Sequence, residues 1–146
     1  MLLAKQVARE AEAEGAYRRA IAEHQHDASA WTNLGELLTG QPARWDEAEE
    51  ALRRATTEDP HKASSWRSLG YLLTKQPARW AEAVEAYRRA TAEDPHDASA
   101  WLSLGILQAQ RPGHEFAAEQ TFRQGVTAGA TACWLSLGRL LSSFTT

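Results

Sequence analysis

The sequence has a single cysteine, Cys133, among its 146 residues, so no disulfide can form within one chain. A lone cysteine suits a reducing compartment. The apolar start, MLLA, is too short for the apolar region of a signal peptide and is soon followed by charge. No run approaches the roughly 20 apolar residues that a membrane-spanning helix needs. These absences predict a cytoplasmic protein with no membrane partner.

A surplus of positive charge is also missing. Lys and Arg number 16 against 19 Asp and Glu, which gives a formal net charge of -3, and the two signs are interspersed. Domains that bind nucleic acid show a basic patch or stripe, so nucleic acid is not expected as a partner. Three arginine pairs lie among glutamates, and we expect them to solvate helix faces. They are Arg18-Arg19, Arg53-Arg54 and Arg88-Arg89.

What the sequence does contain is an internal repeat of 35 residues. Trp31, Trp66 and Trp101 are 35 residues apart, and residues 28–62 match residues 63–97 at 25 of 35 positions. A third unit has diverged: the turn QPARW has become RPGHE. We expect one domain, residues 1–146. It comprises a partial repeat with the N-terminal helix (1–27), two repeats (28–62 and 63–97), a degenerate repeat (98–130) and a C-terminal helix (131–146).

Each unit predicts a first and a second helix. In DASAWLSLGILQAQ, Asp97 is a natural N-cap and the apolar residues follow helical spacing. In the second helix, Pro77 suits the first turn and Pro95 marks the end. The segment QVARE, which stands where QPARW would be expected, has lost the proline. We therefore expect one long N-terminal helix from Leu2 to about Ala22.

Each first helix also carries a glycine, at Gly35, Gly70 and Gly105. Because glycine lacks a Cβ atom, these positions predict a close approach of the second helix. The six tryptophans are expected mostly to pack in the core rather than to contact a ligand.

This pattern resembles the tetratricopeptide repeat (TPR). The shared signature is Trp-x-x-Leu-Gly, then an alanine, a large apolar residue and an alanine at helical spacing, then Asp-Pro. It comprises Trp31, Leu34, Gly35, Leu38, Ala48, Leu52, Ala55 and Pro60, and again Trp66, Leu69, Gly70, Leu73, Ala83, Tyr87, Ala90 and Pro95. The period is 35 rather than 34, and the turn has Pro-Ala-Arg where the family usually has Gly-Asp. The resemblance implies an all-α, right-handed solenoid, here with about seven helices and an unpaired first helix at the C-terminus.

Motifs for catalysis or cofactor binding are missing. The sequence has no glycine-rich phosphate loop, HExxH, CxxC or nucleophile elbow. His26, His61 and His96 recur at equivalent turns, but neighbouring helices pack roughly 8 to 10 Å apart and zinc–nitrogen bonds are only about 2 Å, so one zinc ion could hardly be shared. Cys133 occupies a slot filled by small residues in the other units, which predicts a packed side chain. No enzyme activity, cofactor or metal is expected.

The resemblance implies that the concave face, lined by first-helix residues outside the signature, binds a partner. The matching positions are Thr32, Asn33, Glu36, Gly40, Arg67, Ser68, Tyr71, Lys75, Leu102, Ser103, Ile106, Gln110, Leu135, Ser136 and Arg139. The first two full units differ at only ten positions, and four of these lie on one stripe of the first helix. Exposed positions also drift without function, which is the competing explanation.

We therefore expect a non-enzymatic module that binds a peptide or protein segment. Near-identical repeats with a varied groove also resemble the recognition part of larger bacterial sensing proteins.

The two ends suggest an alternative. LLAKQVAR near the N-terminus matches LLTKQPAR at residues 72–79 in six of eight positions, and CWLSLGRLL is a first helix without a second. Placed together, the ends would form one complete repeat, which predicts a scaffold that assembles into a dimer, ring or filament. The same apolar face would also be exposed in a fragment of a longer array. The residues concerned are Leu2, Leu3, Val7, Trp134, Leu137, Leu140, Leu141 and Phe144.

Overall fold

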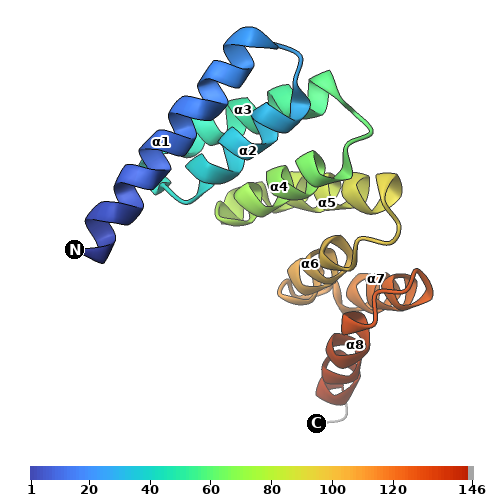
Figure 1. Cartoon of the computed structure of the whole chain (residues 1–146). Helices are drawn as coiled ribbons and strands as arrows, with labels where there is room; N and C mark the ends of the chain where they lie inside the picture. The colour runs from blue at the N-terminus through green and yellow to red at the C-terminus, as the bar shows by residue number, and fades with distance from the viewer. Residues whose placement is uncertain (145–146) are drawn as a thin grey trace.

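The computed structural model describes residues 1–144, which form an arc of stacked helices with the two termini at opposite ends (Figure 1). This confirms the all-α solenoid, although the described residues form eight α-helices where about seven were expected. The helices are α1 (Leu2–Glu23), α2 (Ala28–Thr39), α3 (Trp45–Glu58), α4 (Ala63–Thr74), α5 (Trp80–Glu93), α6 (Ala98–Ala109), α7 (Glu115–Thr127) and α8 (Ala132–Ser143). Two 3-10 helices, η1 (Pro42–Arg44) and η2 (Pro77–Arg79), precede α3 and α5.

The helix boundaries follow from local chemistry. The Asp97 carboxylate accepts hydrogen bonds from the backbone N–H groups of Ser99 and Ala100 at 3.0 and 3.2 Å, which confirms it as the N-cap of α6. Pro77 starts the 3-10 turn η2 rather than α5 itself. The long N-terminal helix is also confirmed, because α1 runs without a break through QVARE.

Close packing at glycine pairs each first helix with the second helix that follows it. A Cβ atom at Gly35 would lie 2.4 Å from Leu52 Cγ, and one at Gly105 would lie 2.2 Å from Phe122 Cε1. Such distances are sterically forbidden, so only glycine allows these helices to approach so closely. The close approach expected from the sequence is therefore present.

The apolar interior divides into two clusters. The larger cluster runs from α2 to α6 and includes Leu38, Leu72 and Tyr87. The smaller one, the C-terminal cluster, contains Phe122 of α7 and Cys133 of α8, and residues of α6 such as Trp101 pack against it. The C-terminal end of the arc therefore has a core of its own.

Tryptophan side chains fasten the turns between units. The Nε1–H groups of Trp31, Trp66 and Trp101 each donate, at 2.8 Å, to the carbonyl oxygen six residues earlier. Those carbonyls belong to Gln25 and to Pro60 and Pro95. Each first helix thus holds the turn that leads into it.

An ion-pair lattice joins successive second helices on the outer surface. Arg44 donates two hydrogen bonds to Glu14 on α1, at 2.7 and 2.8 Å, and also binds Glu47 on α3. Arg18 completes the group by pairing with Glu14 and Glu47. The bonds from Arg44 hold the pKa of Glu14 at about 2. Arg18, expected only to solvate a helix face, therefore joins two helices.

The lattice recurs one unit later. Arg79 binds Glu49 on α3 and Glu82 on α5, and Arg53 pairs with both glutamates. Here the bonds from Arg79 hold the pKa of Glu82 at about 2. We call these two groups together the ion-pair lattice. The first comprises Glu14, Arg18, Arg44 and Glu47, and the second comprises Glu49, Arg53, Arg79 and Glu82.

Candidate recognition groove

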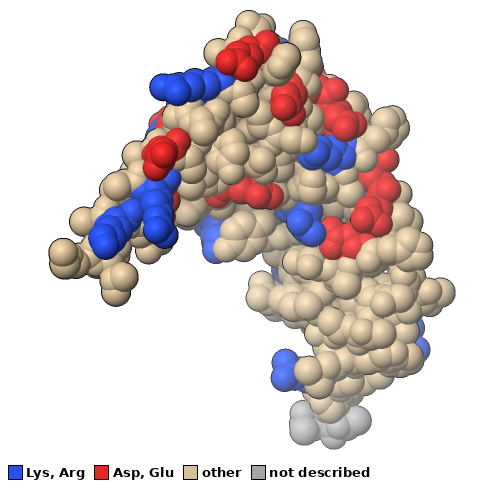
Figure 2. All heavy atoms as spheres, viewed as in Figure 1, with Lys and Arg blue, Asp and Glu red and all other residues tan. Residues whose placement is uncertain are grey.

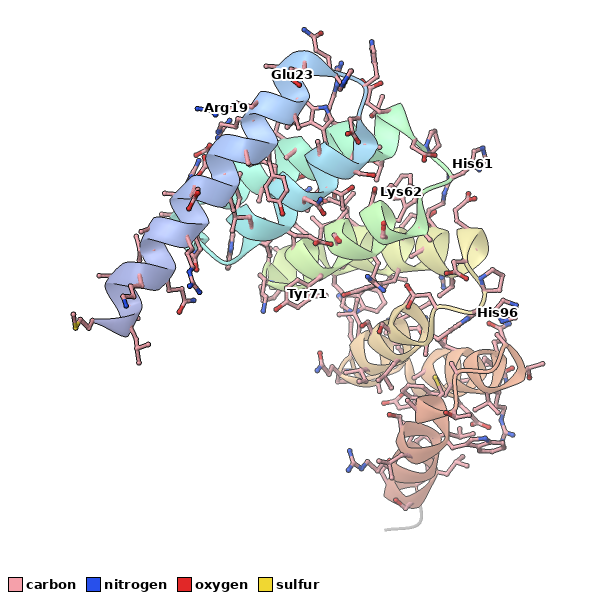
Figure 3. All side chains as sticks on the ribbon, viewed as in Figure 1. Arg19, Glu23, His61, Lys62, Tyr71 and His96 are labelled. Carbon is pink, nitrogen blue, oxygen red and sulfur yellow. The ribbon has the colours of Figure 1, made fainter. Side chains whose placement is uncertain are left out.

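A pocket of about 410 Å³ opens between α2, α4 and α6. In Figure 3, Tyr71 projects from α4 toward the hollow side of the arc, whereas His61 and His96 lie on the opposite side. The pocket is lined by Glu36, Thr39, Arg67, Ser68, Tyr71, Tyr87, Ser99 and Ser103. Five residues expected in the groove, Glu36, Arg67, Ser68, Tyr71 and Ser103, thus meet in one place.

The charged groups of this pocket are fixed by neighbours. Arg67 Nη1 donates to Asp97 Oδ2 at 2.8 Å, while Oδ1 of the same carboxylate caps α6. Glu36 on the other side accepts a hydrogen bond from the Ser68 hydroxyl. Because both side chains are held, the pocket offers a cation and an anion in defined positions.

Aromatic groups provide the apolar surface of the pocket. Tyr71 is 51% exposed, and Lys75 Nζ lies 4.4 Å from its ring centroid in a cation–π contact. Tyr87 forms the buried floor, and burial raises its pKa to about 12, so its hydroxyl stays protonated at neutral pH. An aromatic or aliphatic group could therefore lie on Tyr71 above a neutral hydroxyl.

A second pocket, of about 390 Å³, lies between α6, α7 and α8. It gathers four further residues expected in the groove, Ile106, Gln110, Ser136 and Arg139. Its other lining residues are Ala109, Phe122 and Leu140. This pocket is more apolar than the first, with Arg139 as its only charged side chain.

Other residues expected in the groove lie elsewhere. Thr32 is only 3% exposed, and its hydroxyl bonds Ala28 O and Ser65 Oγ, each at 2.7 Å, so it packs between α2 and α4 and offers nothing to a ligand. Leu102 is half-buried against the C-terminal cluster. Asn33, Lys75 and Leu135 are exposed but do not line either pocket.

Sequence reasoning missed Thr39, Tyr87 and Ser99. Tyr87 was assigned to the framework because it stands at a signature position, where the first unit has Leu52. That difference was the available signal, since a hydroxyl at a core position needs a polar neighbour. Thr39 and Ser99 have identical counterparts in the next or preceding unit, Thr74 and Ser64, and gave no such signal.

The residues considered for self-association differ in exposure. Leu2, Leu3, Val7, Trp134, Leu141 and Phe144 are exposed, and Leu140 is half-buried. Leu137 is 3% exposed and belongs to the core of its own chain, so it cannot contact a partner.

The histidines and the cysteine occupy structural positions. Nδ1 of His26 and of His61 lie 2.7 and 3.0 Å from Glu58 and Glu93 on the second helix that follows each turn. Burial raises the pKa of the Cys133 thiol, which packs in the C-terminal cluster. Within residues 1–144 no group of three or more His, Cys, Asp or Glu is placed to hold a metal ion. Among the described helices, none has the length and apolar character required to cross a bilayer.

Solved structures with the same fold share little sequence with the chain. A crystal structure of MamA has a TM-score of 0.77 at 18% identity, covering 97% of this chain and 82% of that one, and a second MamA structure gives 0.75 and 18%, covering 94% and 75%. YrrB, described as a TPR protein with an unusual peptide-binding site, gives 0.71 at 19% identity, covering 98% and 73%. None of the curated proteins matches the chain.

The family model for the tetratricopeptide repeat matches residues 6–43, 43–78 and 78–132. Its repeats are typical of protein–protein interaction modules that bind protein or peptide partners, and such repeat proteins are generally non-enzymatic. The sequence signature, the helix arrangement and this match agree, and the chain belongs to the tetratricopeptide repeat family.

Proposed function

We propose that the chain binds an extended peptide or protein segment along the hollow side of the arc. The observation that carries this proposal is the composition of the pocket between α2, α4 and α6. Five of its eight lining residues, Glu36, Arg67, Ser68, Tyr71 and Tyr87, stand at four of the ten positions where the two nearly identical units differ, since Glu36 and Tyr71 are equivalent. Variation concentrated in one pocket favours selection for a ligand over drift at exposed positions.

The pocket favours a segment with an acidic and an aromatic or aliphatic side chain. Only Nη1 of Arg67 is engaged by Asp97, so other N–H groups of the guanidinium remain for a ligand carboxylate. Tyr71 lines the same pocket, and Lys75, outside the lining, packs over the Tyr71 ring as a second cation. Aromatic and arginine side chains of this kind often contribute most of the binding energy at interfaces.

The second pocket extends the site toward α8. Neighbouring first helices pack roughly 8 to 10 Å apart, and an extended peptide advances about 3.3 Å per residue. Side chains about three residues apart can therefore enter the two pockets. The second pocket takes an aliphatic side chain against Ile106 and Leu140, with Arg139 at its edge.

A peptide-display selection tests the proposal. A random library panned on the chain should yield a consensus with an acidic residue and an apolar residue about three positions away. The double variant Arg67→Ala, Tyr71→Ala should weaken the selected peptide at least about tenfold, or about 1.4 kcal/mol. Arg19→Ala is the matched control, because Arg19 lies on α1 away from the hollow side (Figure 3). Equal affinity of the double variant and the parent chain would refute the proposal.

Self-association is the second candidate function. The observation in its favour is the exposed apolar face of α8, which carries Trp134, Leu141 and Phe144. Apolar side chains grouped in this way mark interaction surfaces.

A further inference from the structure

We propose that α8 of one copy packs against α1 of a second copy, so that the two helices form a complete hairpin of the repeat. This inference rests on the second candidate function and assigns it a partner and a register. The partner is a second copy of this chain, and the contact is head to tail.

The first half of the interface is an unfilled glycine position on α8. Gly35, Gly70 and Gly105 each face a large side chain of the following helix, and a Cβ atom there would lie within 3.1 Å of it. Gly138 occupies the same place on α8, yet a Cβ atom there would meet nothing within 4 Å. The position into which a leucine or an aromatic ring fits in three other hairpins is therefore open.

The side chains around Gly138 are open as well. Leu141 is 37% exposed, whereas its equivalents on α2 and α4, Leu38 and Leu73, are each 1% exposed. Trp134 is 60% exposed and lies one turn before Gly138 on the same face. We call Trp134, Gly138 and Leu141 the open stripe; on the other first helices a second helix covers this stripe.

The second half of the interface is α1, which is a second helix by sequence. Its Ala13, Ala16, Tyr17 and Ala20 align with Ala48, Ala51, Leu52 and Ala55 of α3, all of which are buried. No residue of α1 is buried, although Tyr17 and Ile21 pack against the larger core cluster. On this face of α1, Ala16 is exposed and Ala13, Tyr17 and Ala20 are half-buried, so the face with which α3 covers α2 is only partly covered on α1.

The register follows from contacts within the chain. Tyr87 lies against Gly70, and Tyr17 is the equivalent tyrosine on α1, so Tyr17 is placed opposite Gly138 of the other copy. Thr121 on α7 donates to Gln108 on α6 at 2.6 Å, and the equivalent pair is Ala16 and Leu141. Two independent contacts therefore give the same alignment of the helices.

The same copy cannot supply the missing helix, because α1 and α8 lie at opposite ends of the arc (Figure 1). The contact is therefore heterologous, and each bound copy leaves one α1 face and one open stripe for further copies. Leu2, Leu3 and Val7 at the start of α1 are exposed as well.

Complementation between two variants tests the inference. Ala16→Glu on α1 and Leu141→Glu on α8 each place a charge in the interface and should weaken association at least about tenfold. The two variants mixed in equal amounts should form a dimer of about 32 kDa, twice the mass of one 16.1 kDa chain, because each still has one intact half. The dimer should not grow, since both of its outer faces carry a glutamate.

Two matched controls use the same substitutions outside the interface. Ala11→Glu lies on the exposed face of α1, because the equivalent residues of α3 and α5, Asp46 and Ala81, are exposed although their helices are covered. Leu135→Glu lies on α8 beside the open stripe. Both should associate like the parent chain. Sedimentation velocity over a concentration series measures the masses, and circular dichroism verifies that each variant is folded.

The outcomes separate this inference from both candidate functions. A parent chain that stays at 16.1 kDa at every concentration overturns self-association and this interface together. If the parent chain assembles and Ala16→Glu assembles equally well, another surface is used and only this register is overturned. A mixture that stays monomeric also contradicts the head-to-tail contact. Peptide binding in the groove involves neither substitution and should persist in both variants.

Discussion

The junctions between second helices differ along the arc. Between α1 and α3, and again between α3 and α5, the ion-pair lattice joins the helices. Between α5 and α7 the equivalent positions hold Val84, Arg88, His114 and Ala117, so both carboxylates and the bridging arginine are gone. In the view of Figure 2, acidic and basic side chains gather over the N-terminal part of the molecule and are few over α6, α7 and α8.

The third junction relies on stacking instead. The ring centroids of His114 and Trp80 are 4.6 Å apart. Arg111 Cζ lies 4.6 Å from the centroid of the same Trp80 ring, in a cation–π contact. These contacts tie the diverged turn to α5 without any carboxylate. Because the buried residues of the C-terminal cluster are also separate from the larger cluster, the comparison indicates a C-terminal end that can open without the rest, as expected when repeats contact only their neighbours.

Phe122→Ala tests this separation most strongly. Removing a fully buried phenylalanine should cost about 3 to 5 kcal/mol, through lost apolar contact and the cavity left behind. Amide hydrogen exchange should accelerate in α7 and α8 while α2 and α3 keep their protection. Leu52→Ala is the matched change in the larger cluster and should expose α2 and α3 instead. Uniform loss of protection along the chain in Phe122→Ala would mean that the two clusters unfold together.

Arg79→His places at the junction of α3 and α5 the residue type that stands at the junction of α5 and α7, where His114 is the equivalent of Arg79. Glu49 and Glu82 would lose one of the two guanidinium groups that bind both of them and keep only Arg53, and stability should fall by about 1 to 2 kcal/mol because two charge-assisted contacts disappear. Urea denaturation followed by circular dichroism measures the change. The reverse substitution, His114→Arg, has no carboxylates at Val84 and Ala117 to bind and should change stability by less than about 0.5 kcal/mol. Equal effects of the two substitutions would contradict a special role for the lattice.

Acid should weaken the ion-pair lattice. The pKa values of Glu14 and Glu82 lie at about 2 in the folded chain, because they accept hydrogen bonds from Arg44 and Arg79, against an ordinary value of 4.5. Below pH 4.5 the unfolded chain binds more protons than the folded one, so stability falls between about pH 4.5 and 2 and is fully present above that window. The loss should be about 1 kcal/mol or less per pair, since the groups are near solvent.

The variant Glu14→Gln, Glu82→Gln provides the control for this titration. It removes two of the groups whose pKa is lowered, so its stability should depend less on pH across the same window. Urea midpoints at pH 6 and pH 2.5 measure the difference. A parent chain and variant that lose the same stability between the two pH values would show that these carboxylates do not determine the acid response.

Sequence periodicity predicted the helices well because the apolar spacing, caps and glycines act within one hairpin. Asp97 as an N-cap and Gly35 and Gly105 as contact points depend on neighbours close in sequence or in the same unit. The positions that were missed depend on the next unit. Thr32 is buried because α4 lies against it and Ser65 takes its hydroxyl, and nothing in the sequence of α2 alone reveals this.

The ion-pair lattice was hidden for the same reason. Arg44 lies 30 residues from Glu14, and only the angle between units brings them together. Arginine pairs mixed with glutamates are as typical of solvated helix faces as of bridges between helices. The groove was partly foreseen because divergence between two near-identical units is visible in one sequence, whereas Tyr87 at its floor was hidden within the signature.

The tryptophans that fasten the turns also make the chain a set of local optical reporters. Trp31, Trp66 and Trp101 each sense the turn before one first helix, and Trp134 lies exposed on α8. Chains with a single tryptophan, the others replaced by phenylalanine, would give a fluorescence signal from one unit at a time. The order in which those signals shift to longer wavelength during unfolding would record in which direction the array comes apart.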